Sequence, residues 1–380
     1  MTGSVEAVLD PTKVSALLTR VRREVDEGLL PAAQIAIGFE GEVVLDETFG
    51  LPPETRFVPF SATKGLIGGA LWRLVGDGAI DLTERVAAYL PGFASNGKDV
   101  VTVEQVAMHL GGFPMAPLGP GRWDTQESRL ESFARWRLTL TPGETFMYHP
   151  TAGHWVLAEI ISAVTGEPYG DAVQRLVTDP LGLPRLLAIP LDEQQGIADA
   201  VGVGEPPTPD EMEEAFGVRI DIGELIPPDV ALGALLTLNT PAARAIGVPG
   251  GGGVMRAADL VRLYQAYLHD PQGMWKPDVL ADATATVRNT LPDMWGVPAN
   301  RTRGGLVVKG DDGLGHRRGF GHTASPRAFG HNGAGGQLAF ADPDPGLSVG
   351  YLTHGLDQNM VREGRRGIAI ASLAADLLPD

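Results

Sequence analysis

Ser61 and Lys64 are the residues of this chain whose types and spacing could do nucleophilic chemistry. Residues three apart on a helix lie on one face, so the lysine ammonium can reach the serine hydroxyl. A serine hydroxyl is a weak nucleophile until an adjacent base takes its proton, and a lysine can be that base once desolvation or a nearby positive charge lowers its pKa. Taken alone, the pair also fits an N-cap serine followed by a solvated lysine.

The residues after Lys64 predict a helix that is buried on several sides, because apolar residues cover more than one of its faces. These residues are Leu66, Ile67, Ala70, Leu71, Leu74 and Val75. Gly65, Gly68 and Gly69 each cost about 0.8 to 1 kcal/mol relative to alanine inside a helix, so they indicate close backbone packing. The start of this helix also offers free N–H groups beside Ser61, where a developing negative charge could be held.

The composition of the chain limits the classes of function. Its 380 residues are 43% hydrophobic and 20% charged, which is ordinary for a soluble globular protein with one large domain or two smaller ones. The absence of cysteine excludes disulfides, thiolate catalysis and cysteine metal sites. A formal net charge of −17 disfavours nucleic acids and anionic membranes as partners, because both would be repelled.

The sequence carries no visible targeting or membrane signal. Residues 1–6 lack the basic region and the apolar stretch of a secretory signal peptide. No run approaches the roughly 18 consecutive apolar residues of a membrane-spanning helix. We therefore expect a cytoplasmic protein.

The two ends of the chain predict one shared sheet. Helical patterns cover residues 11–28 and 360–378, and short apolar runs typical of strands occupy residues 32–37, 42–45, 305–309, 337–341 and 347–353. Neither end can bury a core alone, so we expect an α+β fold in which both termini build one antiparallel sheet flanked by helices. Residues 1–60 and 300–380 would form this sheet domain together, residues 61–299 a mainly helical domain, and the active site their junction.

Within the middle of the chain, residues 102–109 and 151–164 predict helices. Residues 204–214 are rich in proline and acidic residues and predict an exposed loop. The glycines of residues 250–253 are not followed by Gly-Lys-Ser/Thr, which argues against a nucleotide site. The basic run Arg362–Arg366 predicts a solvated helix face.

Four further segments follow Ser61 and Lys64, namely Met108–Gly112, Pro142–Tyr148, Gly251–Leu268 and Gly330–Gly336. Together they complete a pattern that resembles the β-lactamase and penicillin-binding-protein superfamily of serine hydrolases, and within it the class C-like branch with the family VIII esterases. Met108–Gly112 matches the family's histidine-containing turn, and Pro142–Tyr148 matches the approach to its tyrosine. Gly251–Leu268 is similar to its glycine-then-helix segment, and Gly330–Gly336 to its third motif. The resemblance extends from the first helix to the last.

The resemblance implies that Ser61 attacks an acyl carbonyl and forms an acyl-enzyme. Lys64 and Tyr148 would share the acid and base work, with the first proton acceptor left open between them. The backbone N–H groups of Ser61 and Ala334 would hold the oxyanion, and one such donor contributes roughly 3 kcal/mol. No metal or organic cofactor is implied, and the partner would be a small-molecule ester or acyl substrate.

The third motif contains His331 and Gly333 where the family has Lys-Thr-Gly or a His-x-Gly variant. His331 would take the motif's cationic position and orient Tyr148 or a substrate carboxylate, with partial protonation near neutral pH. Two structural alternatives stay open. Tyr148 also fits a core aromatic residue with a hydrogen-bonded hydroxyl, and Asn332 with its neighbours also fits an ordinary loop and turn.

The remaining histidines favour structural roles. We expect His109 to be a buried hydrogen-bonding residue that braces its turn. Two pairs could suggest a metal site, namely His149 with His154 and His316 with His322. Neither pair lies in a H-E-x-x-H motif or a carboxylate-rich cluster, so we expect no metal. The absence of G-x-S-x-G also excludes a nucleophile elbow of the α/β-hydrolase type.

The sequence departs from the family at Tyr148-His149-Pro150, where the usual motif is Tyr-x-Asn. The missing amide is a group that lactamases use to hold the substrate, and proline fits instead as the first-turn residue of the next helix. The missing amide at Pro150 and the presence of His331 in place of lysine together favour a carboxylesterase. An acyltransferase, amide-forming or amidase relative is the first alternative, followed by a β-lactamase or D,D-peptidase. A catalytically silent binding protein is the non-enzymatic alternative.

Large and polar side chains in the loops are candidates for the substrate pocket. We expect substrate contacts from Phe113, Trp123, Phe216, Trp295 and Asn332. Their loops have no regular pattern, so these assignments depend on residue type alone.

Overall fold

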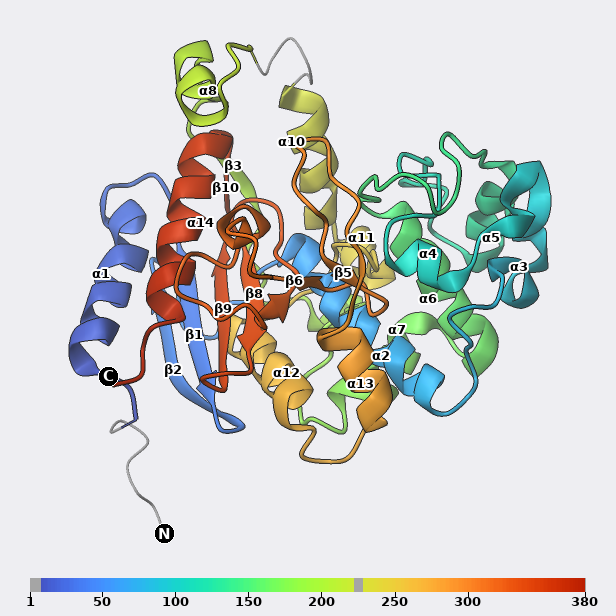
Figure 1. Ribbon diagram of the computed structural model, residues 1–380, viewed down its shortest axis with the longest axis horizontal. Helices are drawn as coiled ribbons and strands as arrows, with labels where there is room; N and C mark the ends of the chain where they lie inside the picture. Colours follow the sequence, from blue (N-terminus) through green and yellow to red (C-terminus); the bar gives the residue numbers. More distant parts are fainter. Residues whose placement is uncertain (1–7, 222–227, 380) are drawn as a thin grey trace.

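The computed structural model describes residues 8–221 and 228–379. Within them, an eight-stranded antiparallel sheet has the order β2-β1-β9-β8-β7-β6-β5-β4 (Figure 1). The strands are β1 (Ala33–Phe39), β2 (Glu42–Phe49), β4 (Val287–Asn289), β5 (Arg301–Thr302), β6 (Val307–Val308), β7 (Phe329–Gly330), β8 (Leu338–Asp342) and β9 (Leu347–Thr353). Both ends of the chain therefore contribute to one sheet, and the predicted α+β fold class is confirmed.

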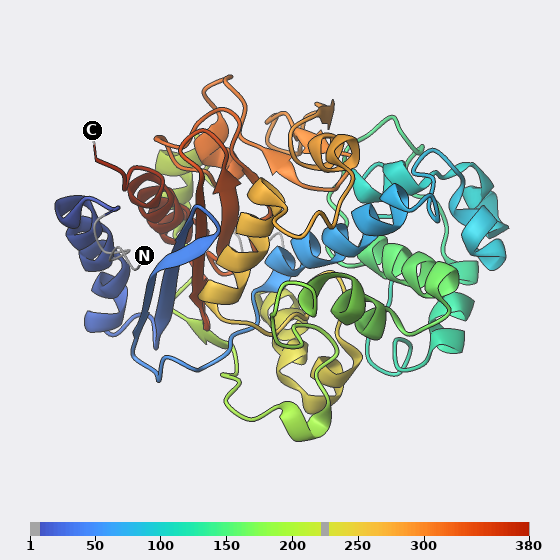
Figure 2. The same ribbon diagram turned by 90° about the horizontal axis from the view of Figure 1, so that it is seen from below.

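Strand β1 joins the two ends of the chain, because it pairs with β2 on one side and with β9 on the other. Its side chains alternate between two cores, as strand geometry requires. Ile35 belongs to the core beneath α1 (Pro11–Asp26) and α14 (Met360–Ala374), whereas Ala36 belongs to the larger core on the side of α12 (Ala257–His269). Figure 2 shows the sheet between these two layers of helices.

The predicted ends of two helices follow from their capping residues. The side chain of Asp10 accepts hydrogen bonds from two N–H groups of the first turn of α1, and Pro11 occupies its first position. Helix α6 (Ala152–Thr165) ends at Gly166, whose φ of 74° is left-handed. Both predicted helices are confirmed to within two residues.

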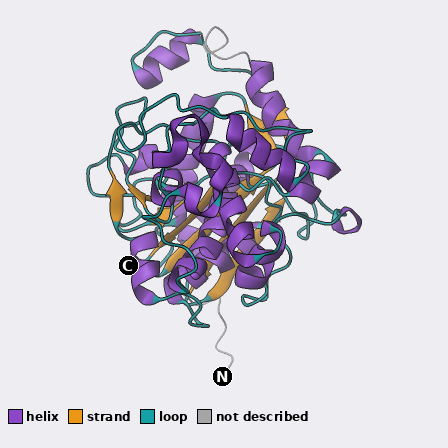
Figure 3. Cartoon of the chain, turned by 90° about the vertical axis from the view of Figure 1, so that its right-hand side faces the viewer, coloured by secondary structure: helices purple, strands orange, loops and turns teal. Residues whose placement is uncertain are grey.

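Helices dominate the segment between β2 and β4. They are α2 (Thr63–Gly76), α3 (Val86–Tyr89), α4 (Val103–Ala107), α5 (Gln126–Arg135), α6, α7 (Tyr169–Val173), α8 (Pro209–Phe216), α10 (Pro228–Leu236), α11 (Pro241–Ile246), α12 and α13 (Pro277–Thr284). A parallel pair, β3 (Val201–Val203) with β10 (Gly355–Asp357), lies apart from the main sheet. Seen from the helical side, helices cover most of the molecule (Figure 3). The boundaries proposed for two domains stay a prediction.

Helix α2 is buried along almost its whole length, as predicted. Its glycines allow the close approach of α12. A Cβ atom at Gly69 would lie 2.5 Å from the hydroxyl of Tyr267, and one at Gly65 would lie 3.0 Å from that of Tyr264. The Tyr267 hydroxyl also donates to the Gly65 carbonyl at 2.8 Å. The helix that follows Ser61 is therefore fixed by packing on several sides.

Two predictions about surface segments are wrong. Part of residues 204–214 is helical, because Pro209 occupies the first position of α8 and Thr208 forms a capping box with Glu211. The run Arg362–Arg366 is not simply a solvated face. Arg366 is 1% exposed and its Nη1 lies 3.0 Å from the carboxylate of Asp357, so the cost of burying the arginine charge is offset by an ion pair.

None of the described helices is long and apolar enough to cross a membrane.

Candidate active site

Ser61 lies in a short 3-10 turn, Phe60–Ala62, immediately before α2. Phe60 has a φ of +48°, in the left-handed region that a bulky residue rarely adopts. Its side chain is 2% exposed, so the surrounding core holds this strained conformation. The Ser61 side chain that follows is half-buried and lines a cavity.

The Ser61 hydroxyl contacts the side chains of Lys64 and Tyr148, the two other catalytic residues predicted from the sequence. The Lys64 ammonium nitrogen lies 3.0 Å from Ser61 Oγ, and the Tyr148 hydroxyl lies 2.9 Å from the same atom. Lys64 also donates to the carbonyls of Pro150 at 2.7 Å and Gly250 at 2.5 Å. The lysine is therefore held in place by three acceptors, and one serine hydroxyl contacts two groups that can carry its proton.

The pKa values of both basic candidates are displaced toward neutral pH. Burial lowers the pKa of Lys64, the neighbouring Tyr148 opposes this shift, and the charge of Arg301 adds a smaller lowering. Burial by itself raises the pKa of the Tyr148 phenol, but the positive charges of Lys64 and Arg301 outweigh it and leave this pKa below its ordinary value. Such shifts are what a lysine or tyrosine needs to accept a proton at neutral pH.

Pro150 does not occupy the first turn of the following helix, so that prediction is wrong. Helix α6 begins at Ala152 with Thr151 as its N-cap. The carbonyl of Pro150 is instead a hydrogen-bond acceptor for Lys64. The helix starts two residues after the proline.

His331 lies beside Tyr148, with 5.9 Å between the ring centroids. It is 5% exposed, and its Nδ1 lies 2.9 Å from the carbonyl oxygen of Asn332. Its buried Nε2 has no hydrogen-bond partner in the part of the chain that the structure describes. Burial, together with the charges of Arg301 and Lys64, holds the pKa of His331 well below its ordinary value. The predicted partial protonation near neutral pH is therefore wrong, because the imidazole is neutral there.

Three more histidines are buried near the tyrosine, and the rings of His149 and His154 both pack against that of His109. His109 lies 4.6 Å from the Tyr148 ring and accepts a hydrogen bond at 3.1 Å from the backbone N–H of His149, which agrees with the predicted bracing role. Burial lowers the pKa of His109 and His154 well below the ordinary value, and that of His149 to about 4. The described residues include no group of three or more potential ligands arranged to hold a metal ion.

The third motif folds around Gly333, which approaches the backbone before Ser61. A Cβ atom at Gly333 would lie 2.1 Å from the carbonyl oxygen of Pro59, so only glycine fits. The Gly333 N–H donates to the Gln337 carbonyl at 3.0 Å. In the described part of the chain, the backbone N–H groups of Ser61 and Ala334 donate to no other residue. Both N–H groups are therefore available to a ligand.

A cavity of about 500 Å³ opens next to Ser61. Its walls combine apolar and cationic residues. The lining includes Ser61, Phe146, Met147, Tyr148, Asp293, Met294, Trp295, Val297, Pro298, Ala299, Arg301, Val307, Arg317, Arg318, His331, Asn332 and Ala334. A second cavity of about 600 Å³ shares five lining residues with the first, namely Asp293, Trp295, Val297, Arg317 and Asn332.

The structure brings only some of the predicted substrate-contact residues to these cavities. Trp295 lines both and stacks on Phe216, with 5.5 Å between the centroids, and Phe216 lines the second. Asn332 lines both, although its side chain binds the Gly319 carbonyl and the Ala339 N–H.

Phe113 and Trp123 line neither cavity, so their assignment as pocket walls is corrected. Phe113 is 1% exposed and packs on Trp136 and His149. Trp123 is 7% exposed and packs on Trp155. Both rings fill the core of the helical region, where large aromatic side chains bury the most apolar surface.

Three groups of the site were missed from the sequence. Two are the backbone carbonyls of Pro150 and Gly250, which accept hydrogen bonds from Lys64. They could not be predicted, because every residue has a backbone carbonyl and no residue type marks one that binds a lysine. The third is Arg301, which lines the cavity with its guanidinium carbon 5.4 Å from the centroid of the Tyr148 ring. Its local sequence, Asn300-Arg301-Thr302-Arg303, has nothing that separates it from a surface arginine.

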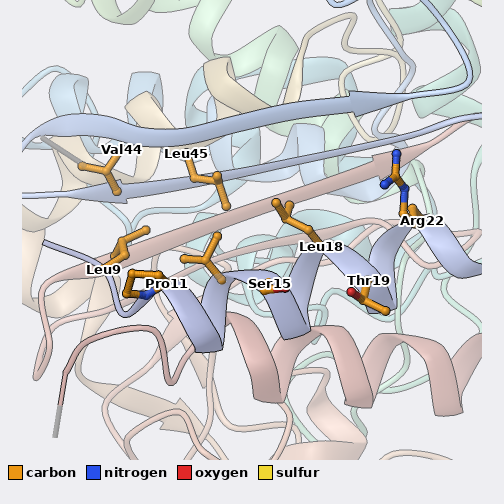
Figure 4. Close-up of a pocket in the computed structure, with 9 residues that line it drawn as sticks. Leu9, Pro11, Ser15, Leu18, Thr19, Arg22, Val44 and Leu45 are labelled. Carbon is orange, nitrogen blue, oxygen red and sulfur yellow. The ribbon is translucent and has the colours of Figure 1, made fainter. Parts of the chain in front are cut away.

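A different groove lies between α1 and β2 (Figure 4). Its lining consists of Leu9, Pro11, Val14, Ser15, Leu18, Thr19, Arg22, Val44 and Leu45. Its leucines and valines belong to the core beneath α1 and α14, whereas the neighbours of Ser61, Phe60 and Ala62, belong to the larger core on the side of α12. None of the predicted site residues lies there, so this groove has no part in the candidate active site.

Comparison with known proteins agrees with the geometry. LipL of Mycobacterium tuberculosis, described as an esterase/beta-lactamase, is 27% identical over 379 residues, which cover 88% of this chain and 79% of LipL. The structure of a penicillin-binding protein homolog from Caulobacter crescentus is similar with a TM-score of 0.77 and 25% identity, covering 96% of this chain and 98% of that one.

The fold is also that of a family VIII carboxylesterase, with a TM-score of 0.74 and 24% identity over 97% of this chain and 99% of that one. The family model described as Beta-lactamase matches residues 18–373, nearly the whole chain. This protein therefore belongs to the Beta-lactamase family and is a serine hydrolase of the β-lactamase fold.

Proposed function

We propose that this protein hydrolyses carboxylic esters through an acyl-enzyme on Ser61. The observation that carries the proposal is the contact of one hydroxyl with two proton carriers, Lys64 at 3.0 Å and Tyr148 at 2.9 Å. Both have lowered pKa values, and the serine lines the cavity. A serine held in this way has an activated proton and an open path to a substrate carbonyl.

The reaction would proceed in two halves. In the first, the Lys64 and Tyr148 pair accepts the Ser61 proton while Oγ bonds to the ester carbonyl carbon. The carbonyl electron pair moves to oxygen, where the N–H groups of Ser61 and Ala334 stabilise the oxyanion by roughly 3 kcal/mol each. When the carbonyl re-forms, the bond to the alcohol oxygen breaks and the pair returns the proton to it. Water repeats these steps on the acyl-enzyme, which releases the acid and restores Ser61.

Three features favour an ester over a β-lactam or peptide. Pro150 provides no side-chain amide for a substrate amide, and His331 is neutral and therefore a poor partner for a carboxylate. Most of the cavity lining is apolar. The relative LipL is described as an esterase/beta-lactamase, which supports the ester reaction and keeps β-lactam or D,D-peptide hydrolysis as a less favoured alternative.

Acyl transfer is the alternative that a specific observation supports. The second cavity adjoins the first at Trp295, Arg317 and Asn332, and the stacked pair Phe216 and Trp295 forms part of its wall. An alcohol or amine held there could reach the acyl-enzyme before water. Amide formation and amide hydrolysis would use the same intermediate.

The deciding experiment measures hydrolysis of p-nitrophenyl esters of graded acyl length, beside nitrocefin, by the wild type and Ser61→Ala. We expect Ser61-dependent ester turnover with little nitrocefin cleavage. Efficient nitrocefin cleavage would instead indicate a β-lactamase. The partition of the acyl-enzyme among added alcohols, amines and water separates a transferase from a hydrolase.

Labelling with a fluorophosphonate probe distinguishes an enzyme from a binding protein. Wild type should be labelled and Ser61→Ala should not. A folded wild type that resists the probe would favour a binding protein built on this fold. Residence in the cytoplasm, a small-molecule ester as the partner and the absence of a cofactor are parts of the same proposal.

A further inference from the structure

Arg301 is a buried cation next to the candidate catalytic residues. It is 6% exposed, and its guanidinium carbon lies 5.4 Å from the ring centroid of Tyr148 and 5.7 Å from that of Phe146. Its Nη1 donates to the Gly305 carbonyl at 2.8 Å, while its buried Nε has no hydrogen-bond partner among the described residues. Burial lowers the pKa of Arg301 only to about 10, so the guanidinium stays charged at neutral pH.

No carboxylate of the described residues neutralises Arg301. The carboxylate of Asp293 lines the same cavity, but it accepts hydrogen bonds from the N–H groups of Trp295 and Val297. A buried charge without a counter-ion is unfavourable, so neighbouring titratable groups change their protonation state to reduce the net charge. Among the described residues, the other titratable groups that interact with Lys64 are the bases His109, His154 and His331.

A count of charges shows which groups must respond. With Lys64 as an ammonium and Tyr148 as a phenol, the site would hold two buried positive charges and no anion. Loss of one proton from the Lys64 and Tyr148 pair leaves the site, with Arg301 included, at a net charge of +1. This holds whether the pair becomes an amine with a phenol or an ammonium with a phenolate. Because the two groups titrate together, the charge of Arg301 acts on both of these states.

We propose that Arg301 is a positioning residue whose permanent positive charge drives one proton off the Lys64 and Tyr148 pair, so that the pair can accept the proton of Ser61. This role rests on the proposed function. The third motif supplies no such charge, because His331 is buried and neutral. Arg301 supplies it from β5, a different strand from the one that leads into the motif.

The test compares the pH dependence of kcat/KM for wild type, Arg301→Gln and Arg301→Lys with a neutral p-nitrophenyl ester. Without the charge the pair keeps its proton to higher pH, so the acidic limb should shift upward by about one pH unit and activity at neutral pH should fall about tenfold. At pH values above the shifted limb, the activity of Arg301→Gln should approach that of wild type. Arg301→Lys should restore at least half of the shift, which a purely steric role would not explain.

Arg317→Gln is the matched control, because it removes the same charge from the same cavity but from an exposed side chain that solvent screens. The acidic limb of the kcat/KM profile of Arg317→Gln should shift much less than that of Arg301→Gln. Equal shifts in the two glutamine variants, or an unmoved limb in a folded Arg301→Gln, would overturn the proposal. A third outcome would also overturn the proposal. If Arg301→Gln loses the preference for an ester that bears a carboxylate while the acidic limb of its pH profile stays in place, Arg301 binds substrate and does not act on the pair.

An ultraviolet titration of tyrosinate separates this inference from the proposed function. The difference between wild type and Tyr148→Phe reports ionisation of Tyr148 without any turnover. If this signal moves to higher pH in Arg301→Gln although no ester is hydrolysed, the inference stands and the ester function fails. If the signal does not move, the inference fails whatever the turnover. Thermal unfolding of each variant establishes that the comparison is made on folded protein.

Discussion

The hydroxyl of Tyr148 donates to the hydroxyl of Ser61 over 2.9 Å, although 87 residues separate them in the chain. The serine precedes α2 and the tyrosine lies in the segment that leads to α6. Helices α2 and α6 pack against one another within the larger core. The contact on which the proposed chemistry depends is therefore a product of helix packing, and it can be tested by removing its atoms one at a time.

Replacement of Ser61 by alanine should abolish ester hydrolysis. Loss of the nucleophile removes the covalent route, so kcat should fall by at least about 10⁴-fold. The thermal midpoint should stay close to that of wild type, because a half-buried hydroxyl contributes little packing. Turnover that survives in Ser61→Ala would show that another residue attacks the ester.

Tyr148→Phe should lower kcat by about 10² to 10⁴-fold, since the ring stays in place while the proton carrier is lost. Tyr169→Phe is a matched control. Its ring is also buried and its hydroxyl donates to the Ile246 carbonyl at 2.6 Å, and Tyr169 lines neither cavity. We expect Tyr169→Phe to lose stability without a comparable fall in kcat. Equal kinetic losses in the two variants would argue for a structural role of Tyr148.

Protein stability should decrease as the pH falls below about 6.5, partly because of His149. Its pKa is about 4 in the folded protein and about 6.5 when unfolded, so the unfolded chain binds more protons between these values. The contribution of His149 is complete above about pH 6.5 and is lost as the pH falls toward 4. Between pH 7 and pH 5 the loss should be about 2 kcal/mol.

The measurement is urea denaturation of wild type and His149→Gln at both pH values. The variant lacks the titrating ring, so its free energy of unfolding should fall less over this interval. An equal fall in the two proteins would mean that His149 does not contribute to the acid sensitivity.

Gly333→Ala should destabilise the protein by about 2 kcal/mol, because the added Cβ would lie 2.1 Å from the Pro59 carbonyl oxygen. The same clash would displace the backbone before Ser61, so kcat should fall as well. Gly364→Ala offers a comparison within α14, where nothing lies within 4 Å of an added Cβ. That change should raise stability by about 0.5 to 1 kcal/mol, as alanine does inside a helix. Similar effects of the two substitutions in denaturation would contradict the packing assigned to Gly333.

Sequence patterns predicted the elements whose signals are local. Asp10 and Pro11 marked the start of α1, and Gly166 marked the end of α6. The prolines in residues 204–214 predict a loop, although Pro209 fits the first position of a helix equally well. A proline thus indicates where a regular pattern changes, but it does not distinguish a helix start from a loop.

The predictions that failed concern side chains whose surroundings come from distant parts of the chain. Trp123 and Phe113 were expected in the pocket and lie in the helical core. Arg366 was expected in solvent and is paired with Asp357 inside the protein. Residue type alone sets what a side chain can do, whereas burial depends on which elements pack over it.

By itself, the sequence determined the fold class, the family, and Ser61, Lys64 and Tyr148 as candidates, because capping residues, periodic apolar positions and ordered motifs are written in the chain. Only the tertiary structure decided how these residues meet. Packing holds Phe60 in a left-handed conformation before Ser61 and neutralises His331 by burial. It also brings Arg301 from β5 to the Tyr148 ring. These outcomes depend on distances and solvent exclusion between separate segments, which no local pattern encodes.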